Sequence, residues 1–208
     1  KSKSWSTLLL IIAICANLGL LIYFKYFYFF LITTQNLLLK DILNPALYSG
    51  IVAPIGISFI TFQRISYVID IYRKKTIPTT NFLQYATYAS LFPHLISGPI
   101  VRFAQIKDQL GKRIINPKTI FEGTKYLVFG LAFKLLIADQ LFISEQMIIE
   151  NISQINIAES AILTIFFSFR IYFDFLGYSL IAMCLAKFIG FDFPINFNSP
   201  YQSTSITD

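Results

Sequence analysis

The sequence contains few charged residues. Only 13% of its 208 residues are charged, whereas soluble domains average about 25%. Hydrophobic residues make up 55% of the chain and include 22 Phe and 12 Tyr, so a folded surface of this composition would expose large apolar patches to water. The scarcity of charge excludes an ordinary water-soluble domain and predicts a membrane protein.

Cysteine and histidine are scarce as well. Cys15 and Cys184 lie in apolar runs without a CxxC pattern or a neighbouring histidine, which favours free thiols over a disulfide or a zinc site. We therefore expect no bound metal. The single histidine, His94, has no Ser, Cys or carboxylate at a spacing that makes a local catalytic pair. The motifs HExxH, GxGxxG and the Walker loop are absent.

Long apolar runs, by contrast, recur along the chain. A helix needs roughly 20 apolar residues to cross a bilayer, and we predict such spans near 6–24, 51–71, 121–143 and 158–191. The last run is too long for one straight span, which predicts a steep tilt or a turn near Gly177 or Gly190. Residues 26–39 are either interfacial or a continuation of the first span. The runs together predict an all-α fold, a polytopic transmembrane helical bundle in a single membrane domain over 1–208.

The basic residues occur in short clusters between the apolar runs. A net charge of +6 can indicate nucleic acid binding, but this distribution is typical of cytoplasmic loops and of contact with lipid headgroups. We therefore expect membrane lipid as a partner and no nucleic acid. The first cluster contains Arg73, Lys74 and Lys75. The second contains Arg102, Lys107, Lys112, Arg113 and Lys118.

The two basic clusters bracket the apolar run at 82–101. If both clusters face the cytoplasm, the chain enters and leaves this run on the same side, which a single span does not allow. Pro93, Gly98 and Pro99 would also break a helix here. We predict a re-entrant or broken element over 82–101, with His94 as part of its framework.

Ionisable residues interrupt the apolar runs, where they usually mark a functional site or a structural pair. Three of them lie in the second and third predicted spans: Arg64, Lys134 and Asp139. Arg170 and Asp174 are four residues apart and share one helix face, with Tyr178 one step further along it. Two interpretations stay open for this face, a local ion pair that lowers the cost of insertion or the polar wall of a substrate cavity.

Four sequence blocks carry a resemblance to a known family. They are PIGISFITFQRISYVIDIYR (Pro54–Arg73), FPHLISGPIVR (Phe92–Arg102), GLAFKLLIAD (Gly130–Asp139), and the stretch from IYFDFLGYS to FPINFNSPYQSTSITD (Ile171–Asp208). In this order they resemble the membrane-bound O-acyltransferase family. The similarity is to the bacterial branch that acetylates alginate and related exopolysaccharides, which includes the D-alanyl transfer protein of teichoic acids.

The resemblance implies a multi-pass enzyme of the cell inner (cytoplasmic) membrane. It implies transfer of an acyl group, which we expect to be acetyl, to hydroxyls of an exopolysaccharide such as alginate. It also implies an acetyl thioester as donor substrate rather than a bound cofactor. The polysaccharide acceptor, together with periplasmic acetyltransferases or an acyl carrier, would be the partners.

The resemblance places the catalytic base outside this chain. In this branch SITD is normally followed by FWxRWH, whose histidine is the catalytic candidate, because a sugar hydroxyl must lose its proton as it attacks. The sequence stops at Asp208, so we expect a fragment of a longer enzyme with no catalytic residue of its own. The alternatives are an inactive truncated membrane scaffold and a transporter-like protein.

Several residues are candidates for the walls of the substrate cavity. They are Arg64, His94, Arg170, Asp174, Tyr178, Asn198, Ser199, Tyr201 and Ser203. The chain reads FLGYSL where the family commonly has FSGYSD. Leu176 and Leu180 therefore replace polar residues on or beside the face that carries Arg170 and Asp174.

Overall fold

A computed structural model describes residues 3–38, 52–95, 98–150, 155–197 and 199–205. Every regular element within these ranges is helical, which confirms the predicted all-α fold. Three helices among the described residues are long and apolar enough to cross a membrane: Ser4–Thr34, Pro117–Ile149 and Ile157–Phe188. The protein is therefore an all-α membrane protein that crosses the bilayer more than once. The chain divides into two compact units.

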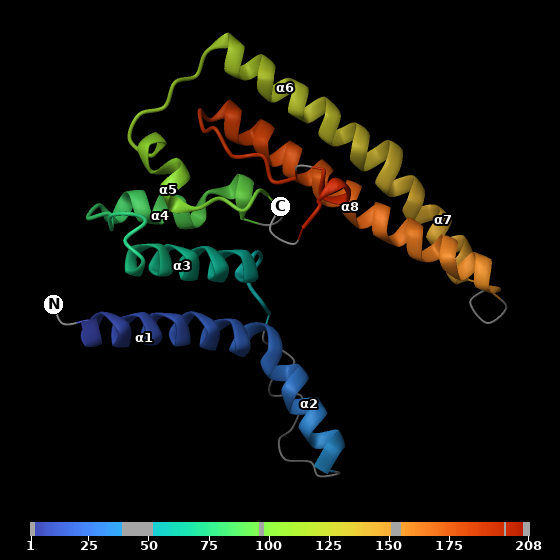
Figure 1. Ribbon diagram of the computed structural model, residues 1–208, viewed down its shortest axis with the longest axis horizontal. Coiled ribbons are helices and arrows are strands. Elements are labelled where there is room, and N and C mark those ends of the chain that lie inside the picture. The colour runs from blue at the N-terminus through green and yellow to red at the C-terminus, as the bar shows by residue number, and fades with distance from the viewer. Residues whose placement is uncertain (1–2, 39–51, 96–97, 151–154, 198, 206–208) are drawn as a thin grey trace. The chain divides into compact units, whose positions relative to one another are not determined.

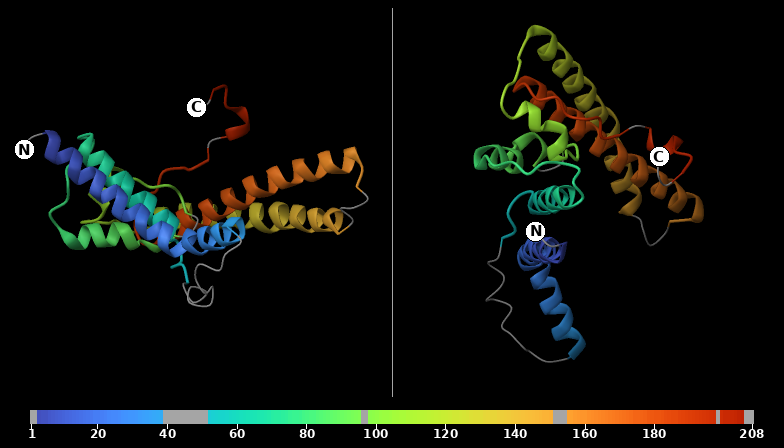
Figure 2. Two further views of the ribbon diagram at one scale, coloured as in Figure 1. Left: turned by 90° about the horizontal axis from the view of Figure 1, so that it is seen from below. Right: turned by 60° about the vertical axis from the view of Figure 1, so that its left-hand side comes forward.

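The first unit comprises Lys1–Ile96 with Arg102–Ala104. Its regular elements are α1 (Lys3–Leu21), a π-helical segment (Ile22–Tyr26), α2 (Phe27–Leu38), α3 (Ile57–Tyr72), α4 (Phe82–Ser90) and a 3-10 turn (Phe92–His94). Figures 1 and 2 show α3 antiparallel to α1 and beside it.

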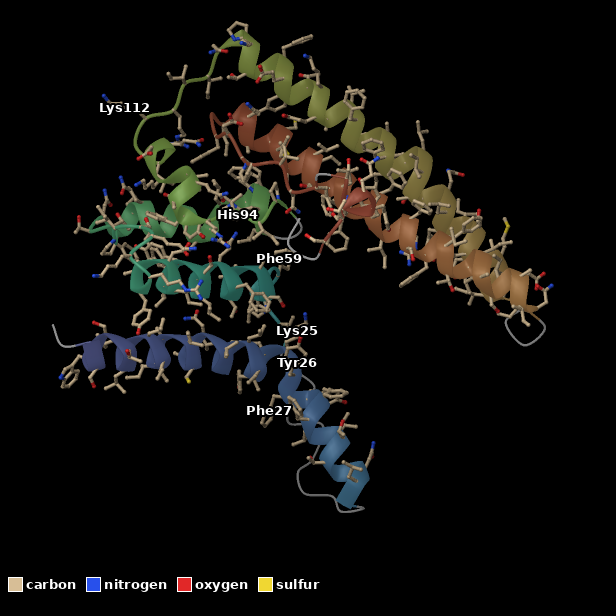
Figure 3. The ribbon with its side chains drawn as sticks, in the orientation of Figure 1. Lys25, Tyr26, Phe27, Phe59, His94 and Lys112 are labelled. Atoms are coloured by element: carbon tan, nitrogen blue, oxygen red, sulfur yellow. The ribbon has the colours of Figure 1, made fainter. Side chains whose placement is uncertain are left out.

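The long N-terminal helix bends where α1 passes into α2 (Figure 1). The π-helical segment Ile22–Tyr26 joins them, and such segments are a common cause of helix kinks. Figure 3 shows Lys25 and Tyr26 at this bend, and Lys25 Nζ donates a hydrogen bond to Ser58 Oγ at 3.1 Å. Of the stretch 26–39, the described residues continue the first helix as far as Leu38.

Helix α3 occupies part of the span predicted near 51–71. It has 16 residues and begins after Gly56, whose φ is +73°. A Cβ at Gly56 would collide with the carbonyl oxygen of Leu95, so only glycine allows the start of α3 to approach that segment this closely.

The apolar run at 82–101 is broken. Asn81 caps α4 by accepting hydrogen bonds from the backbone N–H groups of Leu83 and Gln84, and the helix ends at Ser90. A 3-10 turn follows over Phe92–His94, and residues 98–102 are not helical. Re-entry of this element into the membrane stays a prediction.

The second unit comprises Ser97–Val101 with Gln105–Asp208. Helix α5 (Phe103–Ile106) contains the boundary between the units, because Phe103 and Ala104 belong to the first unit. The elements after it are a 3-10 turn (Lys107–Gln109), α6 (Pro117–Ala132), a π-helical segment (Phe133–Ala138), α7 (Asp139–Ile149), α8 (Ile157–Phe188) and a 3-10 turn (Pro200–Gln202). Helices α6 and α7 continue one another through the π segment, and α8 returns antiparallel beside them (Figure 1).

Asparagine starts both arms of this hairpin. Asn116 Oδ1 accepts a hydrogen bond from Thr119 N at 2.9 Å, and Thr119 Oγ1 accepts one from Asn116 N at 3.1 Å. Asn156 and Glu159 form the same reciprocal capping box at the start of α8. These local signals fix where each long helix begins.

Helix α8 runs without a break through Gly177 and ends at Phe188. Gly190 follows with a φ of +80°, and Phe191 N donates to the Ala186 carbonyl oxygen at 2.8 Å. This is a Schellman ending, in which a left-handed residue closes the helix. The sequence predicted a turn near Gly177 or Gly190, and the chain turns at Gly190.

Candidate functional site

Two glycines bring α6 and α8 into close contact. A Cβ at Gly130 would lie 2.8 Å from the Gly177 carbonyl oxygen, and a Cβ at Gly177 would lie 2.9 Å from the Gly130 carbonyl oxygen. Small residues allow this approach between membrane helices. Side chains one turn away on the two helices can therefore reach each other.

Lys134 lies in the π-helical segment, one turn beyond Gly130. Its Nζ donates a hydrogen bond to Asp139 Oδ1 at 2.7 Å and forms an ion pair with Asp174 Oδ1 at 2.9 Å. The same Nζ lies 5.4 Å from the centroid of the Tyr178 ring. One ammonium group thus joins carboxylates from both arms of the hairpin, in a type of segment that is frequent at functional sites.

Arg170 on α8 binds a carboxylate of α7. Its Nε donates to both carboxylate oxygens of Glu145, each at 2.8 Å, and Glu145 is buried. The guanidinium carbon lies 5.6 Å from the Phe142 ring centroid and 5.2 Å from that of Phe167. Arg170 and Asp174 do not pair with each other, because each has a partner on the facing helix.

A pocket of about 280 Å³ lies among these pairs. Its lining residues are Lys134, Ala138, Asp139, Phe142, Arg170 and Asp174. The wall offers ammonium and guanidinium donors, carboxylate acceptors and one aromatic face. It suits a group that carries carbonyl or hydroxyl oxygens. No group of three His, Cys, Asp or Glu side chains that could hold a metal ion is found in the described part of the chain.

The pocket contains two of the predicted cavity residues, Arg170 and Asp174, and Tyr178 stands beside its lysine. The span predicted near 121–143 does not include Glu145. The helix in fact extends to Ile149 and includes this charge. A helical pattern continued to Ile149 would have revealed Glu145.

His94, labelled in Figure 3, belongs to the first unit. It is fully buried, with 0% of its surface exposed. His94 Nε2 lies 3.0 Å from the Tyr88 carbonyl oxygen. Because that oxygen can only accept, Nε2 carries the proton and donates. Burial lowers the pKa of His94, which lies outside the three candidate spans, to about 4. The ring is therefore neutral at pH 7.

Arg64 also belongs to the first unit, on α3. Its Nε is buried and has no hydrogen-bond partner among the described residues. Neither Arg64 nor His94 lines the pocket of the second unit. Their assignment to a substrate cavity stays a prediction.

The described C-terminal candidates, Ser199, Tyr201 and Ser203, do not line the pocket either. Tyr201 packs on α8, where its hydroxyl donates to the Ser168 carbonyl oxygen at 3.2 Å and its ring lies 5.3 Å from the Tyr172 ring. Ser199 has a left-handed φ of +48°, and Ser203 is exposed. Asn198 lies outside the described residues.

The fold and the site together define a class of protein. This is an integral membrane protein in which two long apolar helices enclose an ion-paired polar pocket. Ionisable groups at such positions are costly and usually serve function.

Comparison with known proteins narrows the class. No model of a known protein family matches the chain. The chain is 36% identical over 209 residues to the probable alginate O-acetylase AlgI of Azotobacter vinelandii. This match covers 100% of this chain and 41% of that protein. It is 36% identical over 201 residues to the probable AlgI of Pseudomonas aeruginosa, covering 96% of this chain and 38% of that protein. It is 32% identical over 235 residues to the peptidoglycan O-acetyltransferase of Helicobacter pylori, and the match covers 100% of this chain and 44% of that protein.

The chain therefore belongs to the membrane-bound O-acyltransferase family, in the branch that contains the alginate O-acetylases, as its sequence blocks predicted. It spans about two fifths of the length of these relatives, 41% of the Azotobacter protein and 38% of the Pseudomonas protein.

Proposed function

We propose that this chain forms part of an enzyme of the inner membrane that transfers acetyl groups to hydroxyls of an exopolysaccharide such as alginate. The observation that carries the proposal is the 36% identity to a probable alginate O-acetylase along the whole chain. The ion-paired pocket supports it, because its donors and acceptors suit a substrate rich in oxygen atoms.

The reaction breaks the C–S bond of an acetyl thioester and forms a C–O bond to the sugar, while the hydroxyl proton passes through a base to the departing thiolate. Arg170 and Lys134 would stabilise negative charge on the carbonyl oxygen. Asp174 would accept a hydrogen bond from a sugar hydroxyl. The base would be the histidine that follows the SITD block in this branch of the family. Periplasmic acetyltransferases or an acyl carrier would complete the transfer.

A chimera tests this function. The chain replaces the matching segment of the Azotobacter vinelandii relative in a host that lacks its own acetylase, and proton NMR measures acetyl ester on the exported alginate. We expect acetylation to be restored, and Arg170→Gln to reduce it on the order of a hundredfold. Lys112→Gln, an exposed position outside the pocket, is the control and should leave acetylation unchanged.

The amount of chimera in the membrane is measured in parallel. A chimera that reaches the membrane at the level of the relative and adds no acetyl ester would contradict the proposal and favour the inactive scaffold. A second measurement uses the same chimera in a host that O-acetylates peptidoglycan. Acetyl ester on the peptidoglycan instead of the alginate would show that peptidoglycan is the acceptor.

A further inference from the structure

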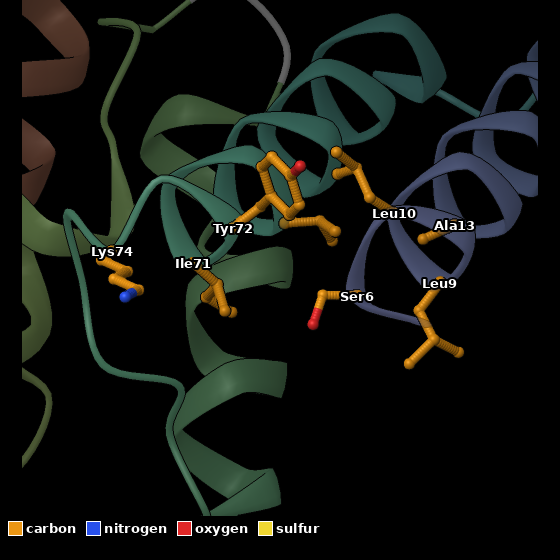
Figure 4. A pocket seen from close by; sticks show the side chains of 8 residues that line it. Ser6, Leu9, Leu10, Ala13, Ile71, Tyr72 and Lys74 are labelled. Atoms are coloured by element: carbon orange, nitrogen blue, oxygen red, sulfur yellow. The ribbon is translucent and has the colours of Figure 1, made fainter. Parts of the chain in front are cut away.

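A second hollow in the described residues lies between α1 and α3, within the first unit. This groove has a volume of about 820 Å³, within the range of roughly 300–1,000 Å³ that ligand sites occupy. Its apolar walls are Leu9, Leu10 and Ala13 on α1 and Val68 and Ile71 on α3. Figure 4 shows side chains of both helices facing the same space. The groove shares no lining residue with the ion-paired pocket of the second unit.

One end of the groove is polar. Ser6 lies near the start of α1 and Lys74 follows the end of α3, so the antiparallel packing places both at the same end (Figure 4). Beside them Thr7 Oγ1 and the Tyr72 hydroxyl are hydrogen-bonded at 3.0 Å. The groove thus joins an apolar slot to a set of hydrogen-bond donors.

Positive charge gathers at the polar end. Arg73, Lys74 and Lys75 follow the end of α3 without an acidic residue among them. Asp70 is the nearest carboxylate along α3. It is buried and is not among the residues that line the groove. The lining of the groove thus contains a lysine and no carboxylate.

The backbone holds Lys74 in a conformation that favours glycine. Its φ is +57°, Lys74 N donates to the Ile71 carbonyl oxygen at 2.9 Å, and Lys75 N donates to the Asp70 carbonyl oxygen at 2.8 Å. A lysine at this position of a helix ending is strained. Strained residues of this kind concentrate at ligand sites.

We propose that this groove binds an anionic phospholipid, with an acyl chain along the apolar walls and the phosphate at Lys74 and Ser6. The apolar walls require hydrocarbon, and the uncompensated cations require an anionic headgroup. Basic residues next to a membrane helix attract the anionic lipids of the cytoplasmic leaflet. A zwitterionic lipid would bring its own cation against the lysine cluster.

Native mass spectrometry of the purified chain tests the site. The protein is released from nanodiscs that contain equal amounts of phosphatidylglycerol and phosphatidylcholine with identical acyl chains. We expect one phosphatidylglycerol to be retained. Lys74→Gln should lower the retention of phosphatidylglycerol about fivefold, because one lysine near an anionic membrane surface contributes about 1 kcal/mol to binding. Ala13→Phe fills the slot and leaves the charges intact, so it should also lower retention.

Two controls keep the test decisive. Lys112→Gln removes an exposed cation outside the groove and should leave retention unchanged. Lys74→Arg preserves the charge and should preserve retention, and circular dichroism checks that each variant keeps its helices. Equal retention of both lipids would overturn the proposal. The proposal would also be overturned if Lys74→Gln and Lys112→Gln lost the same amount of phosphatidylglycerol. The same holds if no lipid is retained, or if a second copy of the chain binds in place of lipid.

Discussion

At the scale of single residues, Arg170 depends on Glu145. Both charges lie in helices long enough to cross the membrane, and Arg170 Nε donates to both carboxylate oxygens at 2.8 Å. Glu145→Gln leaves the guanidinium without its counter-ion. We expect it to lower the free energy of unfolding by about 3 kcal/mol, measured by thermal unfolding in detergent. Glu150→Gln removes an exposed carboxylate just beyond α7 and should change stability little.

A double replacement separates the two roles of this pair. Arg170→Met with Glu145→Leu removes both charges and should restore most of the stability, because neither charge is left unpaired. If the pair serves only insertion, the double variant acetylates normally in the chimera. A stable double variant without activity shows that the charges serve the reaction as well as the fold. Loss of stability as large as that of Glu145→Gln would contradict the ion-pair argument.

His94 makes stability depend on pH. Its pKa is lowered from 6.5 to about 4 in the folded protein, so the unfolded chain binds more protons between these values. The contribution of the neutral ring is complete above pH 6.5 and is lost as the pH falls toward 4, by up to about 3 kcal/mol. Thermal unfolding from pH 7 to pH 4 measures this loss. The stability of His94→Gln should depend less steeply on pH than that of the unaltered protein. The same dependence in both proteins would contradict the lowered pKa of His94.

At the scale of helices, the contact between Gly130 and Gly177 sets how close α6 and α8 lie. Gly130→Ala would place a methyl group 2.8 Å from a carbonyl oxygen, so we expect a loss of about 1–3 kcal/mol in unfolding free energy. Gly19→Ala is the matched control, because nothing lies within 4 Å of a Cβ there. Alanine at position 19 should be neutral or stabilise by up to about 1 kcal/mol. Equal effects at both positions would contradict the packing argument.

The left-handed residues that end α3 and α8, Lys74 and Gly190, predict effects of opposite sign. Gly190→Ala forces a side chain onto a φ of +80° and a Cβ to 2.9 Å from Arg113 Cβ, so unfolding should become easier by about 1–2 kcal/mol. Lys74→Gly relieves a non-glycine residue at a φ of +57° and should stabilise α3 by up to about 1 kcal/mol. Thermal unfolding of both variants in one detergent provides the comparison. A stabilising Gly190→Ala would contradict it.

At the scale of the whole molecule, the basic clusters predict the membrane topology. Lys74→Cys and Lys112→Cys should both react with an impermeant maleimide from the cytoplasmic side, in a background without Cys15 and Cys184. Glu150→Cys follows one candidate span, Pro117–Ile149, and should react from the other side. Labelling of positions 74 and 112 from opposite sides would exclude the re-entrant element.

The sequence predicted the long helices because their signals are local. Apolar runs showed where helices lie, and the family blocks included both Lys134 and Asp174. The partners of the charges were not predictable in the same way. Arg170 pairs with Glu145, 25 residues earlier in the chain, rather than with Asp174 on its own helix. That choice depends on how α7 and α8 pack, and no spacing within one helix reports it.

The two ion pairs across the hairpin have a consequence for its assembly. Arg170 and Asp174 lie one turn apart on α8, opposite Glu145 and Lys134 respectively. If α8 slid by one turn so that Asp174 took the place of Arg170, Asp174 would face Glu145, and like charges would meet in a medium that screens them poorly. When the inserted helices first meet in the bilayer, the alternation of charge therefore rejects slipped registers that apolar surfaces alone would tolerate.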